Sequence, residues 1–455
     1  MKNKTCKRLT LALTAVSLLL VAAILVICLF CTGVFRPVDA ARTEAGTAYP
    51  EYLSQEGYSL EQVVVLSRHN IRSPLSGADS ALGSMTTHEW FDWSSNPSEL
   101  SLRGGAAETM MGQYFRKWME SEGLIPENFI PDGDEVRFYA NSKQRTIATA
   151  EYFSAGLLPV AGIDVEYHME FDQMDPVFTP QLTYVSDAYA ADARATIMDM
   201  FGDRIRALSD NYRLLSDVLD MKRTDAYRSG EIGDFDVNDT ELVLELNKEP
   251  GMKGSLKTGC SAADALVLQY YEEPDPVRAA FGRRLSMKDW RSISAIKDLY
   301  GDVLFTAPMV AVNVAHPLLQ EIEKELNTDG RLFTFLCGHD SNVGSVLAAL
   351  GAEDYSLENT PEEKTPIGCK LVFSRWRSGA GERKISVVLV YQTTDQLRSL
   401  PLLDLENPPA SFRLSFSGLT CNEDGLYDED EFMERLGEAI ADYDELIETY
   451  EELAA

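Results

Sequence analysis

The feature that most constrains the fold is a run of four apolar residues, VVVL at positions 63–66. A strand that is apolar at every position is typical of the centre of a sheet with both faces covered, because a strand with one wet face alternates apolar and polar residues. Further strand patterns occur at 136–140, 332–337, 370–375 and 385–391, and helical patterns occur at 104–122 and 142–155. This alternation predicts an α/β unit.

A long helical segment interrupts this pattern. From about 185 to 300 the apolar spacing is helical, without a convincing strand run, and strand patterns return only after residue 330. We therefore expect residues 59–184 and 301–455 to form one α/β domain, into which a smaller helical cap at 185–300 is inserted. The chain is expected to close with an acidic amphipathic helix.

The N-terminus predicts export. Four positive charges at positions 2, 4, 7 and 8 precede an uncharged stretch at 9–35, which is long enough to cross a bilayer as a helix. The positive flank favours an anchor at 1–35 with the following chain outside the cytoplasm, and residues 36–58 as a stalk. A cleaved signal segment, leaving a secreted or periplasmic protein, stays open as an alternative because small residues flank position 39.

Charge and cysteine content narrow the possible partners. The 41 Lys and Arg against 72 Asp and Glu give a net charge of −31, which disfavours a nucleic-acid partner and requires an anionic ligand to meet a local cationic pocket. With only five His, the sequence implies no metal. Four cysteines follow the N-terminal segment and could form disulfides, in pairs that spacing does not define: Cys260, Cys337, Cys369 and Cys421.

Charged side chains follow the apolar strand directly. The segment RHNIRSP at 68–74 places His69 between Arg68 and Arg72, at a strand end where open parallel sheets bind ligands. Guanidinium groups can hold phosphate oxygens through charge-assisted hydrogen bonds, while an imidazole attacks phosphorus in line. A solvated basic turn is the alternative interpretation of this segment alone.

Two other strand ends carry related residues. The segment CGHDSN at 337–342 places His339 and Asp340 at a strand-to-helix turn, where a helix N-terminus favours anions and a desolvated carboxyl group can donate a proton. Taken alone, Asp340 could simply cap the helix. Arg145, in NSKQRT at 141–146, also follows a strand. Three such segments in an acidic chain predict one phosphate-binding catalytic site.

These segments resemble the histidine acid phosphatases, whose signature is an RHGxRxP loop near the N-terminus and an HD dipeptide late in the chain. Asn70 replaces the usual Gly, a departure shared with the bacterial glucose-1-phosphatase branch. The resemblance runs from about residue 55 to the C-terminus, apart from 220–245, through ANSKQRTIATA (140–150), MDPVFTP (174–180), ADALVLQYYE (263–272), LFTAPMVAVNV (304–314), GHDSN (338–342) and TPIGCKLVFSRWR (365–377).

The resemblance implies an α/β domain with a mainly parallel sheet sandwiched by helices, a smaller α-helical cap, and an active site between them. It also implies two-step hydrolysis of phosphate monoesters without a metal or another cofactor. By the same resemblance, His69 is the nucleophile that becomes phosphohistidine, Asp340 is the proton donor, and the phosphate is bound by Arg68, Arg72, Arg145 and His339.

The leaving group is less constrained by the sequence. Glu272 is similar to a sugar-selecting Glu of the glucose-1-phosphatase branch, and its carboxylate would repel a second phosphate. A sugar phosphate such as glucose 1-phosphate is therefore the expected substrate, with phytate as the rival substrate. The alternative for this segment is purely structural, with two tyrosines that pack between helices and a Glu272 that lies on the surface. A cell-surface module that binds phosphorylated ligands without turnover also stays open, and the oligomeric state is undefined.

Overall fold

The computed structural model describes residues 52–75 and 81–454, which belong to one compact unit, Pro50–Ala455. The predicted anchor at 1–35 and most of the stalk lie outside the described residues. Among the described residues, no single helix is long and apolar enough to cross a membrane, while one bent pair of consecutive helices, Met287–Phe305 and Pro308–Leu326, meets that criterion by length and composition.

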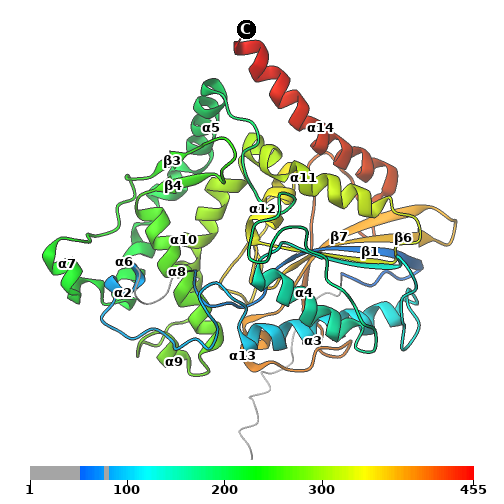
Figure 1. Cartoon of the computed structure of the whole chain (residues 1–455), viewed down its shortest axis with the longest axis horizontal. Helices are drawn as coiled ribbons and strands as arrows, with labels where there is room; N and C mark the ends of the chain where they lie inside the picture. The colour runs from blue at the N-terminus through cyan, green and yellow to red at the C-terminus, as the bar shows by residue number, and fades with distance from the viewer. Residues whose placement is uncertain (1–51, 76–80, 455) are drawn as a thin grey trace, which may run out of the picture. The chain divides into compact units, whose positions relative to one another are not determined.

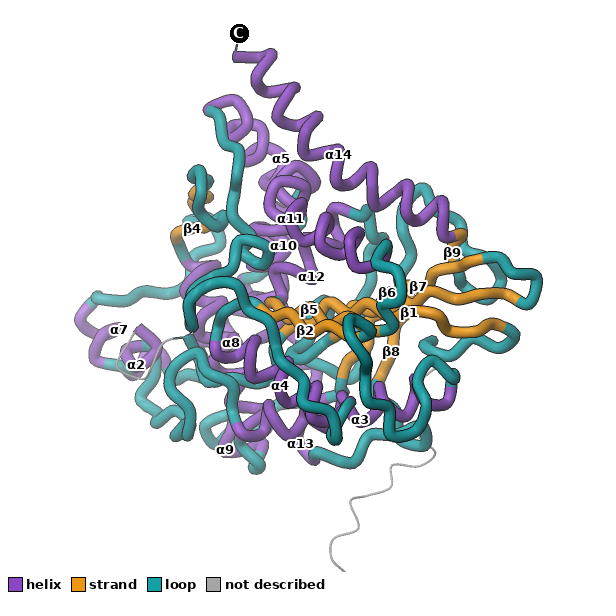
Figure 2. Tube along the Cα trace, turned by 45° about the vertical axis from the view of Figure 1, so that its right-hand side comes forward, coloured by secondary structure: helices purple, strands orange, loops and turns teal. Residues whose placement is uncertain are grey.

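A seven-stranded sheet forms the centre of this unit (Figures 1 and 2). Its main path runs β2-β5-β1-β6-β7-β8, with β9 paired to β7. The strands are β1 (Tyr58–Arg68), β2 (Val136–Ala140), β5 (Phe333–Gly338), β6 (Lys370–Ser378), β7 (Arg383–Tyr391), β8 (Ala410–Arg413) and β9 (Tyr427–Asp428). The residues of β1 from Val63 to Leu66 are fully buried, as the apolar run predicted.

The α/β class is confirmed, but the sheet is mixed rather than mainly parallel. Only β2, β5 and β1 are parallel neighbours, whereas β6, β7, β8 and β9 join by antiparallel pairing. For β6 and β7 the reason is connection length, because residues 379–382 are too few for the crossover that parallel neighbours require. Gly381, with φ of +89°, allows the tight reversal between these two strands.

Helices cover both faces of the sheet. Figure 1 shows α3 (Leu102–Ser121) and α4 (Gln144–Leu157) on one face, and α11 (Pro308–Leu326), α12 (Asp340–Ala349) and α14 (Glu429–Ala454) on the other. The helices α3 and α4 approach closely at Gly112 and Gly156, where an added Cβ atom would lie 2.2 and 2.1 Å from backbone oxygens of the opposite helix. Of two further short helices, α13 (Thr394–Ser399) follows β7, whereas α2 (Ala81–Ser84) lies beside the helical segment described next (Figure 1).

The segment predicted as a helical cap is mostly helical. It contains α5 (Asp187–Arg206), α6 (Ser209–Val218), the 3-10 turn η1 (Met221–Arg223), α7 (Asp225–Ser229), α8 (Ser255–Glu272), α9 (Pro276–Ala279) and α10 (Met287–Phe305). The sequence patterns did not reveal a short antiparallel hairpin, β3 (Glu241–Val243) with β4 (Gly251–Lys253), because three-residue strands leave no periodic pattern. The predicted boundary at residue 300 falls inside α10, and the division into domains stays a prediction.

Strand register brings the three predicted segments to one edge of the sheet. Arg68 at the end of β1 lies beside Gly338 at the end of β5, and Ala140 at the end of β2 lies beside Cys337. The loops that follow are tied by backbone hydrogen bonds, from His69 N to Gly338 O at 3.0 Å and from Asn141 N to Cys337 O at 2.9 Å. The parallel part of the sheet therefore positions the candidate site.

Candidate active site

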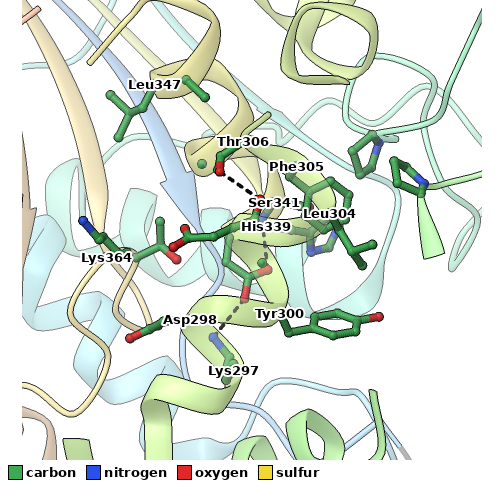
Figure 3. Close-up of a pocket in the computed structure, with 18 of the residues that line it drawn as sticks. Lys297, Asp298, Tyr300, Leu304, Phe305, Thr306, His339, Ser341, Leu347 and Lys364 are labelled. Atoms are coloured by element: carbon green, nitrogen blue, oxygen red, sulfur yellow. Dashed lines mark hydrogen bonds and ion pairs between the residues drawn. The ribbon is translucent and has the colours of Figure 1, made fainter. Parts of the chain in front are cut away.

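A pocket of about 810 Å³ opens at this edge of the sheet. Its lining includes five of the seven residues predicted for the site: His69, Arg72, Arg145, His339 and Asp340. Helices α8 and α10 also contribute to the wall. Figure 3 shows part of this wall, including Lys297, Asp298 and Tyr300 of α10. The prediction that three strand ends converge on one site is thus consistent with the geometry.

His69 is buried, with 3% of its surface exposed, and its ring is held by the backbone. Its Nδ1 atom lies 2.9 Å from the carbonyl oxygen of Asn70, an atom that can only accept a hydrogen bond. The neutral ring therefore carries its proton on Nδ1 and keeps the lone pair on Nε2. Burial, followed by the charges of Arg145 and Arg72, holds the pKa of His69 well below its ordinary value. The imidazole is thus a neutral base that can attack through Nε2.

Arg72 and Arg145, two of the arginines that line the pocket, differ in their partners. Arg72 donates from Nη2 to Asp264 Oδ2 at 3.0 Å, whereas Arg145 has no carboxylate ion pair among the described residues and its buried Nε lacks a hydrogen-bond partner. Burial and the nearby charge of Arg72 lower the pKa of Arg145 to about 10, so it is still charged at neutral pH. An anion that enters the pocket would satisfy Arg145.

Arg68 lies beneath the pocket and is not one of its lining residues. Its guanidinium is 1% exposed, with Nη1 2.9 Å from Glu362 Oε1 and Nη2 3.4 Å from Asp340 Oδ2. Thr365 O accepts a further hydrogen bond from Nη1. In this arrangement Arg68 supports a carboxylate at the pocket floor, while its predicted contact with phosphate stays a prediction.

His339 is the residue before α12 and is oriented by Asn141. The side-chain oxygen of Asn141 accepts from the backbone N–H of Asp175 at 2.9 Å, so its amide nitrogen faces His339 Nε2, at 2.7 Å. Burial, and then the charge of Arg145, holds the pKa of His339 well below its ordinary value. The two imidazole rings meet edge to face, with centroids of His69 and His339 5.5 Å apart.

Asp340 is the first residue of α12, and its side chain is 38% exposed in the pocket. Its Oδ2 lies 3.1 Å from Lys297 Nζ as well as 3.4 Å from Arg68. Desolvation acts to raise the pKa of Asp340, but Arg68 and Lys297 outweigh it and hold the pKa well below its ordinary value. This carboxyl group is therefore ionised at neutral pH.

Glu272 is not among the residues that line the pocket, and its role in sugar selection stays a prediction. It is the last residue of α8, and its Oε2 accepts a hydrogen bond from Ser101 Oγ at 2.8 Å. Asp264, earlier on α8, is the acidic residue of this helix that lines the pocket. Asp264 and Glu272 are eight positions apart on α8, which corresponds to about 12 Å along the helix axis. The neighbouring tyrosines pack, with Tyr270 stacked on Trp290.

Sequence reasoning missed Asp264 and Lys297. Asp264 lies in the ADALVLQYYE segment that carried the resemblance, so the segment was identified although a different acid of it was selected. Lys297 stands alone in a helical pattern, and no local signal marks it.

The sequence left open whether the four described cysteines form disulfides, and in the structure all four are free. Cys337 and Cys369 are buried within the fold. Within residues 52–75 and 81–454, no cluster of three or more His, Cys, Asp or Glu side chains could hold a metal ion.

Comparison with known proteins identifies the family of this chain. Residues 59–392 match the model of the histidine phosphatase superfamily (branch 2). Glucose-1-phosphatase of Providencia rettgeri is 35% identical over 423 residues, covering 92% of this chain and 99% of that protein. Glucose-1-phosphatase of Salmonella typhimurium is 37% identical over 382 residues, covering 83% and 92%.

Phytases are similar as well. Phytase AppA of Escherichia coli is 29% identical over 395 residues, covering 81% of this chain and 89% of that protein. The solved apo structure of Hafnia alvei phytase superposes with a TM-score of 0.77 at 26% identity, covering 85% of this chain and 98% of that one. The chain therefore belongs to the histidine phosphatase superfamily, branch 2, and is a phosphoric monoester hydrolase.

Proposed function

We propose that this protein is an exported phosphatase that hydrolyses a sugar monophosphate, such as glucose 1-phosphate, through a phosphohistidine intermediate. The observation that carries the proposal is the neutral His69, with its lone pair on Nε2, in a pocket that also contains Arg145 without a carboxylate partner among the described residues. The relatives named glucose-1-phosphatase support the substrate class.

In the proposed reaction, the substrate phosphate binds between Arg72 and Arg145, with Arg68 and His339 completing the cationic surroundings. The Nε2 lone pair of His69 forms a bond to phosphorus while the bond from phosphorus to the leaving oxygen breaks. Asp340 supplies a proton to that oxygen, so an alcohol leaves instead of an alkoxide. Water then attacks the phosphohistidine, Asp340 takes back a proton, and inorganic phosphate and neutral His69 are released.

The charge pattern of the pocket favours a single phosphate. Most pocket cations already face a carboxylate, in the pairs Arg72–Asp264, Arg204–Asp302, Lys297–Asp340 and Lys364–Asp354. Among the described residues that line the pocket, Arg145 and Lys257 are the basic side chains without such a pair. The remaining positive charge suits one phosphate, while the carboxylates can accept hydrogen bonds from sugar hydroxyls.

Phytate hydrolysis is the second candidate. It is favoured by the similarity to phytases, both in sequence and in solved structures. Against it, a highly phosphorylated ligand would meet Asp264, Asp302 and Asp354 in the pocket. A module that binds without turnover is not proposed, because the chain belongs to a family of phosphoric monoester hydrolases.

Phosphate release at acidic pH would test the proposal. The full-length protein in detergent is offered glucose 1-phosphate and phytate separately, with EDTA present and with H69A as the control. We expect faster release from glucose 1-phosphate, unaffected by EDTA and lost in H69A. A preference for phytate would overturn the substrate assignment, and undiminished activity of H69A would overturn the mechanism.

The proposed export rests on the N-terminal segment at 1–35. Fractionation of cells that produce the full-length chain, with protease added from outside, tests it. We expect the enzyme in the membrane fraction and accessible to protease. Release of a shortened soluble enzyme would favour signal cleavage instead.

A further inference from the structure

Lys297 is a buried lysine at the floor of the pocket, on α10. Its side chain is 8% exposed, and Nζ lies 3.1 Å from Asp340 Oδ2 and 3.8 Å from Glu362 Oε1. Figure 3 shows its side chain reaching toward the pocket from the helix. A buried ammonium group is costly unless it is paired, so its partners indicate what it does.

Lys297 belongs to a cluster of two cations and two carboxylates: Arg68, Lys297, Asp340 and Glu362. Glu362 is 2% exposed, and its Oε2 accepts from Tyr271 OH at 2.7 Å. Arg68 and Lys297 both contact Oδ2 of Asp340, whereas Oδ1 accepts a hydrogen bond from the backbone N–H of Ser341 at 3.0 Å. Because Oδ1 faces no cation and keeps a second lone pair, it is the oxygen that can carry a proton. Protonation of Asp340 leaves the cluster with a net positive charge.

We infer that Lys297 is a positioning residue for the proton donor Asp340. Lys297 fixes Oδ2 of Asp340 and keeps this carboxyl group ionised until a substrate phosphate fills the pocket. This inference rests on the proposed role of Asp340. The phosphate brings negative charge to Arg72 and Arg145, offsets the positive cluster, and allows Oδ1 to take up a proton. That proton passes to the leaving oxygen, and Asp340 returns to the carboxylate that pairs with Lys297.

Several other titratable groups surround the pair. The groups that face Asp340 or Lys297 from the neighbouring elements are Arg68 of β1, His69, Arg145 of α4, Glu249, Cys260 and Asp264 of α8, Asp298 and Tyr300 of α10, His339, Glu362 and Cys369. Of these, Arg68 also contacts Asp340 Oδ2, at 3.4 Å, but it lies nearer to Glu362, at 2.9 Å. Lys297 has the opposite preference, at 3.1 Å from Asp340 and 3.8 Å from Glu362. Burial and Arg68 act to lower the pKa of Lys297, yet Asp340 and Glu362 outweigh them, so Lys297 stays charged.

The test compares K297M with K297R, using K288M as the matched control, because Lys288 is an exposed lysine on the same helix. The rate kcat is measured against pH with glucose 1-phosphate. Loss of a positive charge beside a carboxylate makes that carboxylate easier to protonate, so the alkaline limb of kcat should move to higher pH by about one unit or more in K297M. K297R should keep the limb near its original position, and K288M should leave it unchanged.

A second comparison separates positioning from folding. With p-nitrophenyl phosphate, whose leaving group needs little proton transfer, K297M should retain more of its activity than with glucose 1-phosphate. In a D340N background, K297M should cause no further shift of the limb. An unchanged alkaline limb in K297M, or the same shift in the D340N background, overturns the inference. Undiminished activity in H69A would instead show that the proposed mechanism itself has failed.

Discussion

The Nδ1 atom of His69 lies 2.9 Å from the carbonyl oxygen of Asn70, the next residue in the chain. The side chain of Asn70 is itself held by two hydrogen bonds, from its Nδ2 to Glu108 Oε2 at 2.7 Å and from the backbone N–H of Ile71 to its Oδ1 at 2.8 Å. This chain of contacts orients the imidazole from behind and directs Nε2 away from the backbone. The nucleophile is therefore fixed before a substrate binds.

Activity should persist under acid conditions. A histidine nucleophile must be neutral, and its neutral fraction falls as the pH drops through the pKa that this histidine has in the folded protein. Burial and the charges of Arg145 and Arg72 hold the pKa of His69 well below its ordinary value, so kcat/KM should be maintained when pH falls from about 6.5 to 5. A pH profile from acid to neutral conditions measures this. A loss of about tenfold per unit beginning near pH 6.5 would contradict the expectation.

Replacement of Arg145 should impair binding and turnover together. R145Q removes a pocket cation that has no carboxylate pair among the described residues, and we expect kcat/KM to fall by about 10² to 10³. Inhibition by inorganic phosphate should weaken in parallel. R206Q, which changes an exposed arginine on α5 paired with Asp203, is the control and should behave as the original protein.

Asp264 and Glu272 should differ in their effect on substrate choice. Asp264 lines the pocket and pairs with Arg72, so D264N frees positive charge and should raise kcat/KM for phytate relative to glucose 1-phosphate. Glu272 lies outside the pocket, so E272Q should leave KM for glucose 1-phosphate within about twofold. A change in KM for E272Q larger than that for D264N would reverse this assignment.

The ion pair between Lys370 and Glu108 should be important for stability. Its atoms Nζ and Oε1 are 2.7 Å apart, and both side chains are fully buried. K370M leaves the Glu108 charge without its partner and should lower the free energy of unfolding by about 3 to 5 kcal/mol. Urea denaturation measures the loss. The double variant E108Q/K370M should recover part of it, because no buried charge is then left unpaired.

Local patterns in the sequence were sufficient to locate the segments that carry charged residues at strand ends. The apolar run before Arg68 indicated a buried strand, and the charged residues after three strands indicated one edge of a sheet. Five of the predicted residues, including His69 and Asp340, line a common pocket. Strand burial and strand ends depend on short stretches of sequence, which is why local patterns indicate them.

Long-range relationships could not be obtained in this way. The direction of β6 relative to β1 depends on how distant strands pair, and the partner of Asp340 on α10 lies 43 residues away in the chain. The choice between Asp264 and Glu272 depended on how α8 meets the pocket, since both are acids on one helix.

The sequence by itself therefore determined the α/β class, the family and a set of candidate residues that could attack, bind or protonate a phosphate ester. Only the tertiary structure decided which of them share the pocket, that Arg68 lies beneath it, and that Lys297 joins Asp340. The physical reason is that the ionisation of a buried side chain depends on charges within a few ångströms, and in a folded chain those charges come from segments that are far apart in sequence.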